Sequence, residues 1–381
     1  MIIMIYEPSD DSFLLQRNIS KYAKKGMKVI DIGTGSGIQA EELRKHTVDV
    51  TAVDINPEVI SHCKEKFDNI KIIESDLFSN VSGKFDLITF NPPYLPDDHR
   101  VKDIALDGGK HGYELTEMFL NDVVIHLNIN GKLLLLFSSY TNKGKVDSFI
   151  LQNCLKFKQI DMMKLDFEEL FVYEISKSFL LKDLEKHGLK NVYYLTKGHR
   201  GIIFTGIDGG GRKIAVKSEL STSEAIGRIE NEIMILKKIN KYGIGPKILF
   251  HGEKYFAYEF IEGERIIDFI KANSKDKIIE VVLKVVDQLI ILDKLGISKE
   301  EMHHPVKHIL VGKEVVMIDF ERAHHTQKPQ NITQFCQFLI ELTGVFKEKE
   351  IVVDKEGIIK FAKSYHGNVD VKPLLNMIKD W

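Results

Sequence analysis

The sequence predicts two domains of different fold class: an α/β domain on a doubly wound parallel sheet, followed by an α+β domain. With 381 residues the chain is too long for one core of average size. From residue 27 short apolar runs alternate with helical stretches, which is typical of a parallel sheet with crossover helices. After about residue 180, strand-like runs joined by glycine turns precede long amphipathic segments. We therefore place the domains at 1–182 and 190–381.

The elements of the first domain follow from these runs in chain order. Four apolar runs predict strands: "MKVIDIG", "VDVTAVDI", "IKIIESDL" and "FDLITF". The segments "GIQAEELRKH" and "NPEVISHCKEKF" between them predict helices. Farther on, "GKLLLLFSS" predicts a buried strand and "KQIDMMKLDFEELFVYEIS" a terminal hairpin. The expected result is a seven-stranded sheet.

Charge and composition exclude some classes of protein. The formal net charge is −2, about −5 for residues 1–190 and about +3 for the remainder, which argues against a general affinity for nucleic acid. The three cysteines, Cys63, Cys154 and Cys336, lie far apart without metal-type spacing. No apolar run approaches the length of a membrane span. We expect a reduced, cytoplasmic protein.

Glycines and acids at the predicted strand ends indicate a nucleotide-type cofactor pocket. In "VIDIGTGSGIQAEEL", glycines including Gly33 lie where a strand turns into a helix, so the backbone can approach a ligand closely. Asp31 before that turn would repel a pyrophosphate but suits a cofactor with a cationic amino-acid end. Asp54 ends the second strand, where a carboxylate can bind ribose hydroxyls. Asp76 ends the third strand and can accept from the exocyclic amine of adenine.

The stretch "FDLITFNPPYLP" ends a strand with an asparagine and two prolines. Proline has no N–H and a fixed φ, so Pro92 and Pro93 force the chain out of the sheet after Asn91. The result is a stiff loop with a polar group at Asn91 and an aromatic ring at Tyr94. Such a loop either merely terminates the strand or holds a flat polar group.

Together these motifs resemble the HemK family within the class I S-adenosylmethionine-dependent methyltransferases. "YEPSDDSFLL", "DIGTGSG", "VDINP", "SDLF", "NPPY" and "ALDGGKHGYEL" occur in that family's order and spacing, over residues 5 to about 178. The family methylates the side-chain amide of the glutamine in the Gly-Gly-Gln loop of peptide-chain release factors. The resemblance implies a cofactor site of Ser12, Asp31, Gly33, Asp54, Asp76, Leu77 and Asn91. It also implies that Asn91, Pro92, Pro93 and Tyr94 hold the substrate amide.

The branch of the family and the class of acceptor have alternatives. The chain starts only a few residues before "YEPSDDSF", without the helical domain of the bacterial members, so it resembles the archaeal and eukaryotic branch. That branch works with a small zinc-binding activator subunit, which we expect as a partner. The same Asn-Pro-Pro-Tyr logic serves N6-adenine methyltransferases of nucleic acid, which usually need a basic surface and a target-recognition region. We keep that activity as the alternative.

The second domain contains "TKGHRGIIFTGIDGGGRKIAVKSE", then "ENEIMILKKI" and "VVMIDFERA". Together these segments resemble a protein kinase, and the whole resembles the small RIO-like kinases of archaea, over residues 190 to about 345. The glycines at 198 and 201 would then cover phosphates, and Lys217 would be the strand lysine. Glu232 is the expected helix partner of Lys217, with Glu230 as alternative. Asp319 would bind Mg²⁺ with ATP. The triple glycine at 209–211 is either a hairpin turn or, less in keeping with its place, a phosphate loop.

The catalytic loop departs from the kinase pattern. "EEMHHPVKHILV" aligns His303 with the catalytic aspartate and His308 with the metal-binding asparagine, so the loop lacks the proton acceptor and one metal ligand that phosphoryl transfer uses. We expect a nucleotide-binding or docking module, and an active atypical Ser/Thr kinase stays the alternative. The histidines 303, 304, 308, 324 and 325 could also bind a transition metal.

Overall fold

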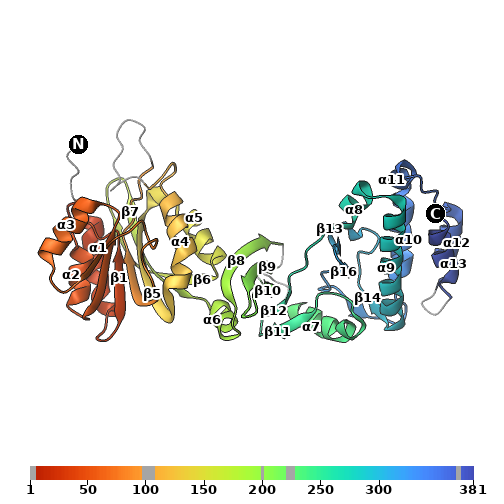
Figure 1. Ribbon diagram of the computed structural model, residues 1–381, viewed down its shortest axis with the longest axis horizontal. Coiled ribbons are helices and arrows are strands. Elements are labelled where there is room, and N and C mark those ends of the chain that lie inside the picture. Colours follow the sequence, from red (N-terminus) through yellow and green to blue (C-terminus); the bar gives the residue numbers. More distant parts are fainter. Residues whose placement is uncertain (1–5, 97–107, 199–200, 220–227, 366–369) are drawn as a thin grey trace. The chain divides into compact units, whose positions relative to one another are not determined.

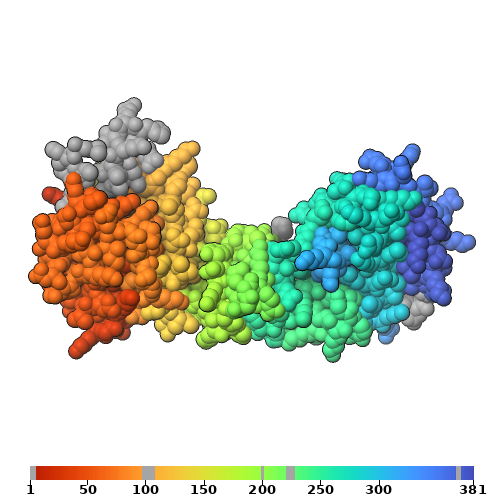
Figure 2. Space-filling view, in the orientation of Figure 1, coloured from red at the N-terminus to blue at the C-terminus, as the bar shows by residue number. Residues whose placement is uncertain are grey.

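The computed structural model describes residues 6–96, 108–198, 201–219, 228–365 and 370–381. The chain divides into two compact units, Met1–Tyr194 and Leu195–Trp381. In Figures 1 and 2 the first unit runs from red to yellow-green and the second from green to blue. The division falls inside a strand, β8 (Lys190–Lys197), and the helix α6 (Phe179–Lys186) occupies the stretch where the sequence changes character. No helix in the described ranges combines the length and apolarity that a membrane crossing needs.

The first unit contains the predicted seven-stranded sheet, in the order β3-β2-β1-β4-β5-β7-β6. Strands β1 to β5 pair in parallel, and β7 is antiparallel to both β5 and β6. The predicted terminal hairpin is thus confirmed. The bounds are β1 (Lys28–Ile32), β2 (Asp49–Asp54), β3 (Lys71–Glu74), β4 (Phe85–Phe90), β5 (Leu127–Ser138), β6 (Leu155–Lys164) and β7 (Glu169–Lys177).

Helices cover both faces of this sheet, as the alternation of strands and helices predicts (Figure 1). On one face α1, α2 and α3 bury a core that includes Leu14, Leu43 and Val59 against alternate strand residues such as Val29 and Leu134. The other face is covered by α4 and α5. The bounds are α1 (Asp10–Tyr22), α2 (Ile38–Arg44), α3 (Pro57–Lys66), α4 (Glu114–His126) and α5 (Lys143–Gln152). Because β1, β2 and β4 run parallel, their carboxyl ends bring Asp31, Asp54 and Asn91 to one edge of the sheet.

After the first sheet, the chain forms a five-stranded sheet in the order β11-β12-β10-β9-β8, in which β9 to β12 pair antiparallel. The triple glycine at 209–211 lies in the turn between β9 and β10, so the hairpin prediction is confirmed. The further strands of the sheet are β9 (Gly201–Ile207), β10 (Lys213–Glu219), β11 (Ile248–His251) and β12 (Tyr255–Glu259). The expected phosphate-covering turn between β8 and β9 includes residues 199–200, which lie outside the described residues.

Helices form most of the rest of the second unit. Their shared core centres on α9, whose buried face includes Val282, Val286 and Leu289 and packs against α10 and α13. The helices are α7 (Arg228–Ile239), α8 (Ile266–Ala272), α9 (Lys275–Lys294), α10 (Asn331–Glu341), α11 (Thr343–Glu348), α12 (Lys355–Ser364) and α13 (Lys372–Lys379). The unit also contains two small sheets. One has the three strands β13 (Glu264–Arg265), β15 (Ile309–Val311) and β16 (Val315–Met317), and the other pairs β14 (Ile297–Ser298) with β17 (His324–His325).

Candidate active site

The glycine turn between β1 and α2 has the backbone conformation that its sequence predicts. Gly33, Gly35 and Gly37 all have positive φ, at 62°, 51° and 78°, a region that L side chains rarely adopt. At Gly37 a Cβ would also lie 2.5 Å from the ring of Phe67. Strain and crowding together exclude larger residues here, so the turn keeps its backbone open toward the sheet edge.

Asp31 is buried at the carboxyl end of β1, with only 1% of its surface exposed. Its two oxygens accept hydrogen bonds from the hydroxyls of Thr34 and Thr89, both at 2.7 Å. Burial is the main cause that raises the pKa of Asp31 to about 7, and the two hydroxyls only partly oppose it. A cationic group of a ligand would favour the ionised form.

The other two acids differ in how they are held. Asp54 accepts the amide N–H of Gly35 at 3.0 Å and that of Asn56 at 2.9 Å, so it fixes the glycine turn as well as ending β2. The sequence analysis predicted that Asp76 ends the third strand, but β3 stops at Glu74. The chain then enters a turn, in which the Ser79 amide N–H donates to the Asp76 carbonyl. The Asp76 side chain is exposed there, and Leu77 beside it has a φ of 46°.

The Asn-Pro-Pro-Tyr loop starts directly after β4, as the prolines predict. The Asn91 amide nitrogen Nδ2 donates to Asp11 Oδ2 at 2.9 Å. The Asn91 carbonyl oxygen Oδ1 is buried and has no hydrogen-bond partner among the described residues. A buried acceptor without a donor costs free energy unless a ligand supplies one. This oxygen is therefore an unused acceptor that a donor of a ligand could satisfy.

Asp11 and Tyr6 belong to the site although the sequence analysis did not single them out. Asp11 is buried and accepts the Tyr6 hydroxyl at 3.0 Å on each oxygen. Ser12, a predicted cofactor residue, gives Asp11 its amide N–H at 2.5 Å and its hydroxyl at 3.2 Å. The motif "YEPSDDSF" contains all three residues. The acid directly before Ser12 in this motif was therefore the sequence signal that could have identified Asp11.

A glycine-rich segment supports the Asn-Pro-Pro-Tyr loop from behind. The Gly108 amide donates to the Leu95 carbonyl at 2.8 Å, and a Cβ at Gly108 would lie 2.7 Å from the Pro93 carbonyl oxygen. Burial, followed by the nearby carboxylates of Asp11 and Glu168, raises the pKa of Tyr94. Tyr94 therefore keeps its phenolic proton at neutral pH. The structure thus brings Asn91, Pro92, Pro93 and Tyr94 together on one rigid support.

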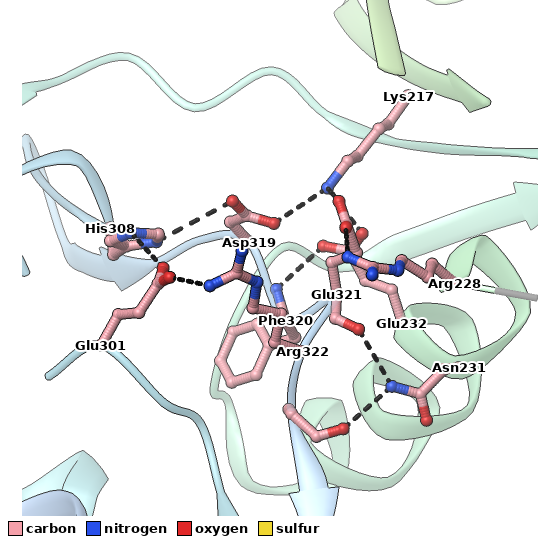
Figure 3. Close-up of polar contacts among 11 residues, drawn as sticks. Lys217, Arg228, Asn231, Glu232, Glu301, His308, Asp319, Phe320, Glu321 and Arg322 are labelled. Carbon is pink, nitrogen blue, oxygen red and sulfur yellow. Dashed lines mark hydrogen bonds and ion pairs between the residues drawn. The ribbon is translucent and has the colours of Figure 1, made fainter. Parts of the chain in front are cut away.

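In the second unit the predicted charged residues also meet (Figure 3). Lys217 on β10 donates to Glu232 on α7 at 2.7 Å and to Asp319 at 3.1 Å. Glu230 is exposed, so Glu232 is the partner, as expected. Although burial opposes it, the charges of Glu232 and Asp319 raise the pKa of Lys217. Asp319 has a φ of 62°, a strained conformation of the kind that is often found at functional sites.

In the second unit, His308 of the predicted catalytic loop lies between two carboxylates. Its Nδ1 lies 3.9 Å from Asp319 Oδ2. Its other nitrogen, Nε2, lies 3.2 Å from Glu301 Oε2. His303, the predicted equivalent of the catalytic aspartate, stacks against His304 at 5.0 Å. Glu301 also pairs with Arg322 (Figure 3).

The histidine cluster does not form the metal site that the sequence allowed. Within the described ranges, His, Cys, Asp and Glu side chains nowhere gather in a group of three or more that could hold a metal ion. His304 instead lies 3.4 Å from Glu341 and His324 3.6 Å from Glu300. These histidines therefore face individual carboxylates.

The parallel sheet, the glycine turn, the strand-end acids and the Asn-Pro-Pro-Tyr loop define a class I S-adenosylmethionine-dependent methyltransferase. Residues 10–162 match the family model described as "Methyltransferase small domain". The chain is 37% identical, over 44% of its length and 89% of the relative, to a Methanocaldococcus jannaschii protein with the provisional name protein N5-glutamine methyltransferase. The chain therefore belongs to the same methyltransferase family as this relative.

The comparisons also gave two further similarities. The release factor glutamine methyltransferase of Lactococcus lactis is 29% identical over 35% of this chain and 55% of that enzyme. The chain therefore spans about half the length of this relative. The solved E. cuniculi Mtq2–Trm112 complex, responsible for methylation of the eRF1 translation termination factor, is 25% identical with a TM-score of 0.39. The match covers 45% of the present chain and 98% of the matched chain of that complex.

Proposed function

We propose that the first unit methylates the side-chain amide nitrogen of a glutamine in a protein, the glutamine of the Gly-Gly-Gln loop of a peptide-chain release factor. The observation that carries this proposal is Asn91 Oδ1, a buried acceptor without a partner among the described residues. The names of the relatives from Methanocaldococcus jannaschii and Lactococcus lactis support the choice of a glutamine acceptor.

The chemistry explains why a rigid acceptor loop suits this substrate. An amide nitrogen is a poor nucleophile because its lone pair is delocalised, as the barrier of about 18–20 kcal/mol to rotation of an amide bond shows. The substrate NH₂ group has two N–H donors. Asn91 Oδ1 and the Pro92 carbonyl accept these two N–H groups and direct the substrate nitrogen toward the methyl group, while Tyr94 covers the flat face of the substrate amide. Orientation and electrostatic stabilisation then supply the rate, without a strong general base.

The residues at the sheet edge fit S-adenosylmethionine, which supplies an electrophilic methyl group when bound. Asp31 is a buried acid whose ionised form a cationic ligand would favour. The glycine turn leaves backbone space beside it, and Asp54 and Asp76 would face the ribose and the adenine. We assign Ser12, Gly33 and Leu77 to the same cofactor site. A small activator subunit with bound zinc would assist the enzyme, as in the branch that the sequence resembles.

Methyl transfer from labelled S-adenosylmethionine tests this proposal. The full chain is incubated with a release factor, with and without an activator subunit, and the label is mapped by mass spectrometry. We expect one methyl group on the Gly-Gly-Gln glutamine and none on a Gln-to-Ala release factor. Label that persists on the Gln-to-Ala protein would contradict the assignment. Label on an adenine-containing oligonucleotide in place of the protein would favour the alternative N6-adenine activity.

We further propose that the second unit is a kinase-like module that binds ATP with Mg²⁺. The arrangement of Lys217 between Glu232 and Asp319 supports it, because it presents a cation to phosphates and a carboxylate to a metal. The sequence aligns His303 and His308 with the aspartate and asparagine that a kinase needs, so we propose binding or docking rather than phosphoryl transfer.

ATP-dependent melting and phosphate transfer, measured together, test this second proposal. We expect Mg²⁺–ATP to stabilise the protein, Lys217→Met to abolish that stabilisation, and no labelled phosphate to appear on the chain or on the release factor. Robust phosphate transfer that Asp319→Ala abolishes would show an active kinase instead. Melting that does not respond to any nucleotide would contradict nucleotide binding.

A further inference from the structure

The contact between Asp11 and Asn91 joins two segments that lie 80 residues apart in the chain. Asp11 is in the first turn of α1, and Asn91 follows β4. Asp11 is 4% exposed, and its carboxylate collects donors from Tyr6, Ser12 and Asn91. A buried carboxylate with several donors is stable in one position. Asp11 is therefore a fixed reference point beside the substrate loop.

The chemistry of the two side chains determines which way the Asn91 amide faces. An asparagine amide has a donor end and an acceptor end, and a rotation by half a turn exchanges them. An ionised carboxylate only accepts, so the Nδ2 end must face Asp11. The acceptor Oδ1 is then directed away from Asp11, at a buried position without a partner among the described residues.

We propose that Asp11, held by Tyr6, is a positioning residue for methyl transfer, because it fixes the Asn91 amide with Oδ1 toward the substrate N–H. This inference rests on the proposed amide methylation. Without the carboxylate, the Asn91 amide could take either of its two orientations. In one of them Nδ2 would face the substrate, so that an N–H of Asn91 would point at an N–H of the substrate amide. The productive arrangement would then be lost without loss of the fold.

Asp11 also strengthens the acceptor that it positions. A donor bonded to a carboxylate is polarised, and the polarisation passes through the amide and makes Oδ1 a better acceptor. The substrate nitrogen gains positive character as it attacks the methyl group, so the stronger acceptor favours the transition state over the bound substrate. The effect of Asp11 should therefore fall on kcat rather than on cofactor affinity.

The first test compares Asp11→Asn with Asp10→Asn. Asp10 precedes Asp11 in the same helical turn but is exposed. Asp10→Asn therefore removes the same charge from the same end of α1 without touching the buried contact. We expect Asp11→Asn to lower kcat about 100-fold, the size of a misplaced reacting group, with less than about a threefold change in cofactor Kd. Asp10→Asn should leave kcat unchanged. Equal kcat values for the two variants would overturn the proposal.

A double-mutant cycle separates positioning from a general structural role. If Asp11 acts through Asn91, Asp11→Asn should have little further effect in an Asn91→Ala background, less than about threefold. If Asp11 only supports the fold, its effect on kcat should be the same in both backgrounds, and the proposal fails. Tyr6→Phe should give a smaller loss than Asp11→Asn, because Asp11 keeps its bonds to Ser12 and Asn91.

An NMR measurement keeps the inference testable even if the methyl acceptor is another molecule. The Asn91 side-chain amide resonances, assigned by their loss in Asn91→Ala, should shift in Asp11→Asn and stay in place in Asp10→Asn. Wild-type protein that fails to methylate any release factor would contradict the proposed function, and shifted resonances would still support the contact. Unshifted resonances in Asp11→Asn would overturn the positioning role itself.

Discussion

At the scale of single residues, the buried carboxyl of Asp31 couples the cofactor site to pH. Its pKa is raised to about 7 because burial disfavours the charge. The folded pKa lies above that of the unfolded chain, so the folded state binds the proton more tightly. The stability that this provides is fully present below about pH 4 and is lost as the pH rises through about 7. The site therefore holds an ionisable group that a cationic ligand can stabilise in its charged form.

We predict that the affinity for S-adenosylmethionine falls as the pH is lowered from 8 to 6. If binding needs the ionised form of Asp31, the decrease should be about tenfold, from the fraction that is ionised at each pH. Isothermal titration calorimetry at a series of pH values measures it. In Asp31→Asn the affinity should be lower at pH 8, and the Asp31-dependent step near pH 7 should disappear. A step that survives in Asp31→Asn would assign the pH dependence to another group.

We predict that Asn91→Asp changes cofactor affinity by less than about tenfold, or 1.4 kcal/mol, and lowers turnover by about two or more orders of magnitude. The new carboxylate would face Asp11, which the Asn91 amide contacts at 2.9 Å. Its charge would also stabilise a cationic ground state more than a transition state in which that charge disperses. Asn91→Ala should lose turnover as well, and Tyr94→Ala should mainly weaken substrate orientation.

Asn128→Asp is a matched control for this change. Asn128 donates to Asp86 at 2.6 Å within the same unit, so the substitution also sets two carboxylates against each other. It should reduce stability and leave turnover per folded molecule unchanged. Near-normal turnover of Asn91→Ala at saturating cofactor and partner would show that the loop does not hold the amide.

At the scale of elements, the substrate loop depends on its contact with the glycine segment at 108–112. Gly112 has a φ of +80°, and a Cβ there would lie 2.6 Å from the Tyr94 carbonyl oxygen and 3.2 Å from the Pro96 nitrogen. These are backbone atoms of the segment whose prolines limit its freedom to adjust. The rigidity that orients the substrate amide thus also means that the Asn-Pro-Pro-Tyr loop cannot move away from a side chain added in the glycine segment.

We predict that Gly112→Ala lowers methyl transfer by about 100-fold, the cost of displacing a reacting group by about 1 Å. Gly26→Ala is the matched control, since Gly26 has a φ of +84° but no atom within 4 Å of an added Cβ. Both variants should lose about 1 kcal/mol of stability from the positive φ, measured by urea unfolding. If Gly26→Ala loses as much turnover as Gly112→Ala, backbone strain rather than crowding is responsible.

At the scale of the whole molecule, each of the two compact units buries apolar side chains of its own, which indicates two independent folding units. The core that includes Leu14 and Val172 belongs to the first unit, and the core that includes Val286 and Phe346 belongs to the second. The only tryptophan, Trp381, is buried in the second core, with its ring 5.1 Å from that of Phe346. Its fluorescence therefore reports the second unit.

We predict two thermal transitions, of which each ligand shifts one. A ligand at 100 times its Kd stabilises its domain by about 2.7 kcal/mol, which raises the Tm of a domain of this size by about 5–10 °C. Mg²⁺–ATP should raise the transition that Trp381 fluorescence follows, and S-adenosylmethionine should raise the other one in calorimetry. A single transition that both ligands shift would show that the units unfold together.

Local sequence was enough to predict most of the helices and strands of the first unit. Strand ends, glycine turns and the proline-terminated loop all follow from backbone preferences that a few neighbouring residues set. The sheet with its antiparallel end and the hairpin at 209–211 were predicted in this way and confirmed. The Lys217–Glu232 pair was predicted from the resemblance to protein kinases, and the structure has this contact.

Tertiary structure decided which distant side chains meet. The hydrogen-bond partner of Asn91 is Asp11 from α1, and His308 lies between the carboxylates of Glu301 and Asp319. Glu300 and Glu301 have φ values of 67° and 59°, a conformation uncommon for residues other than glycine, which the sequence analysis did not predict. Sequence by itself thus determined the conformation of most segments. The hydrogen-bond partners depended on packing, because a donor and an acceptor far apart in the chain meet only when the segments between them are folded.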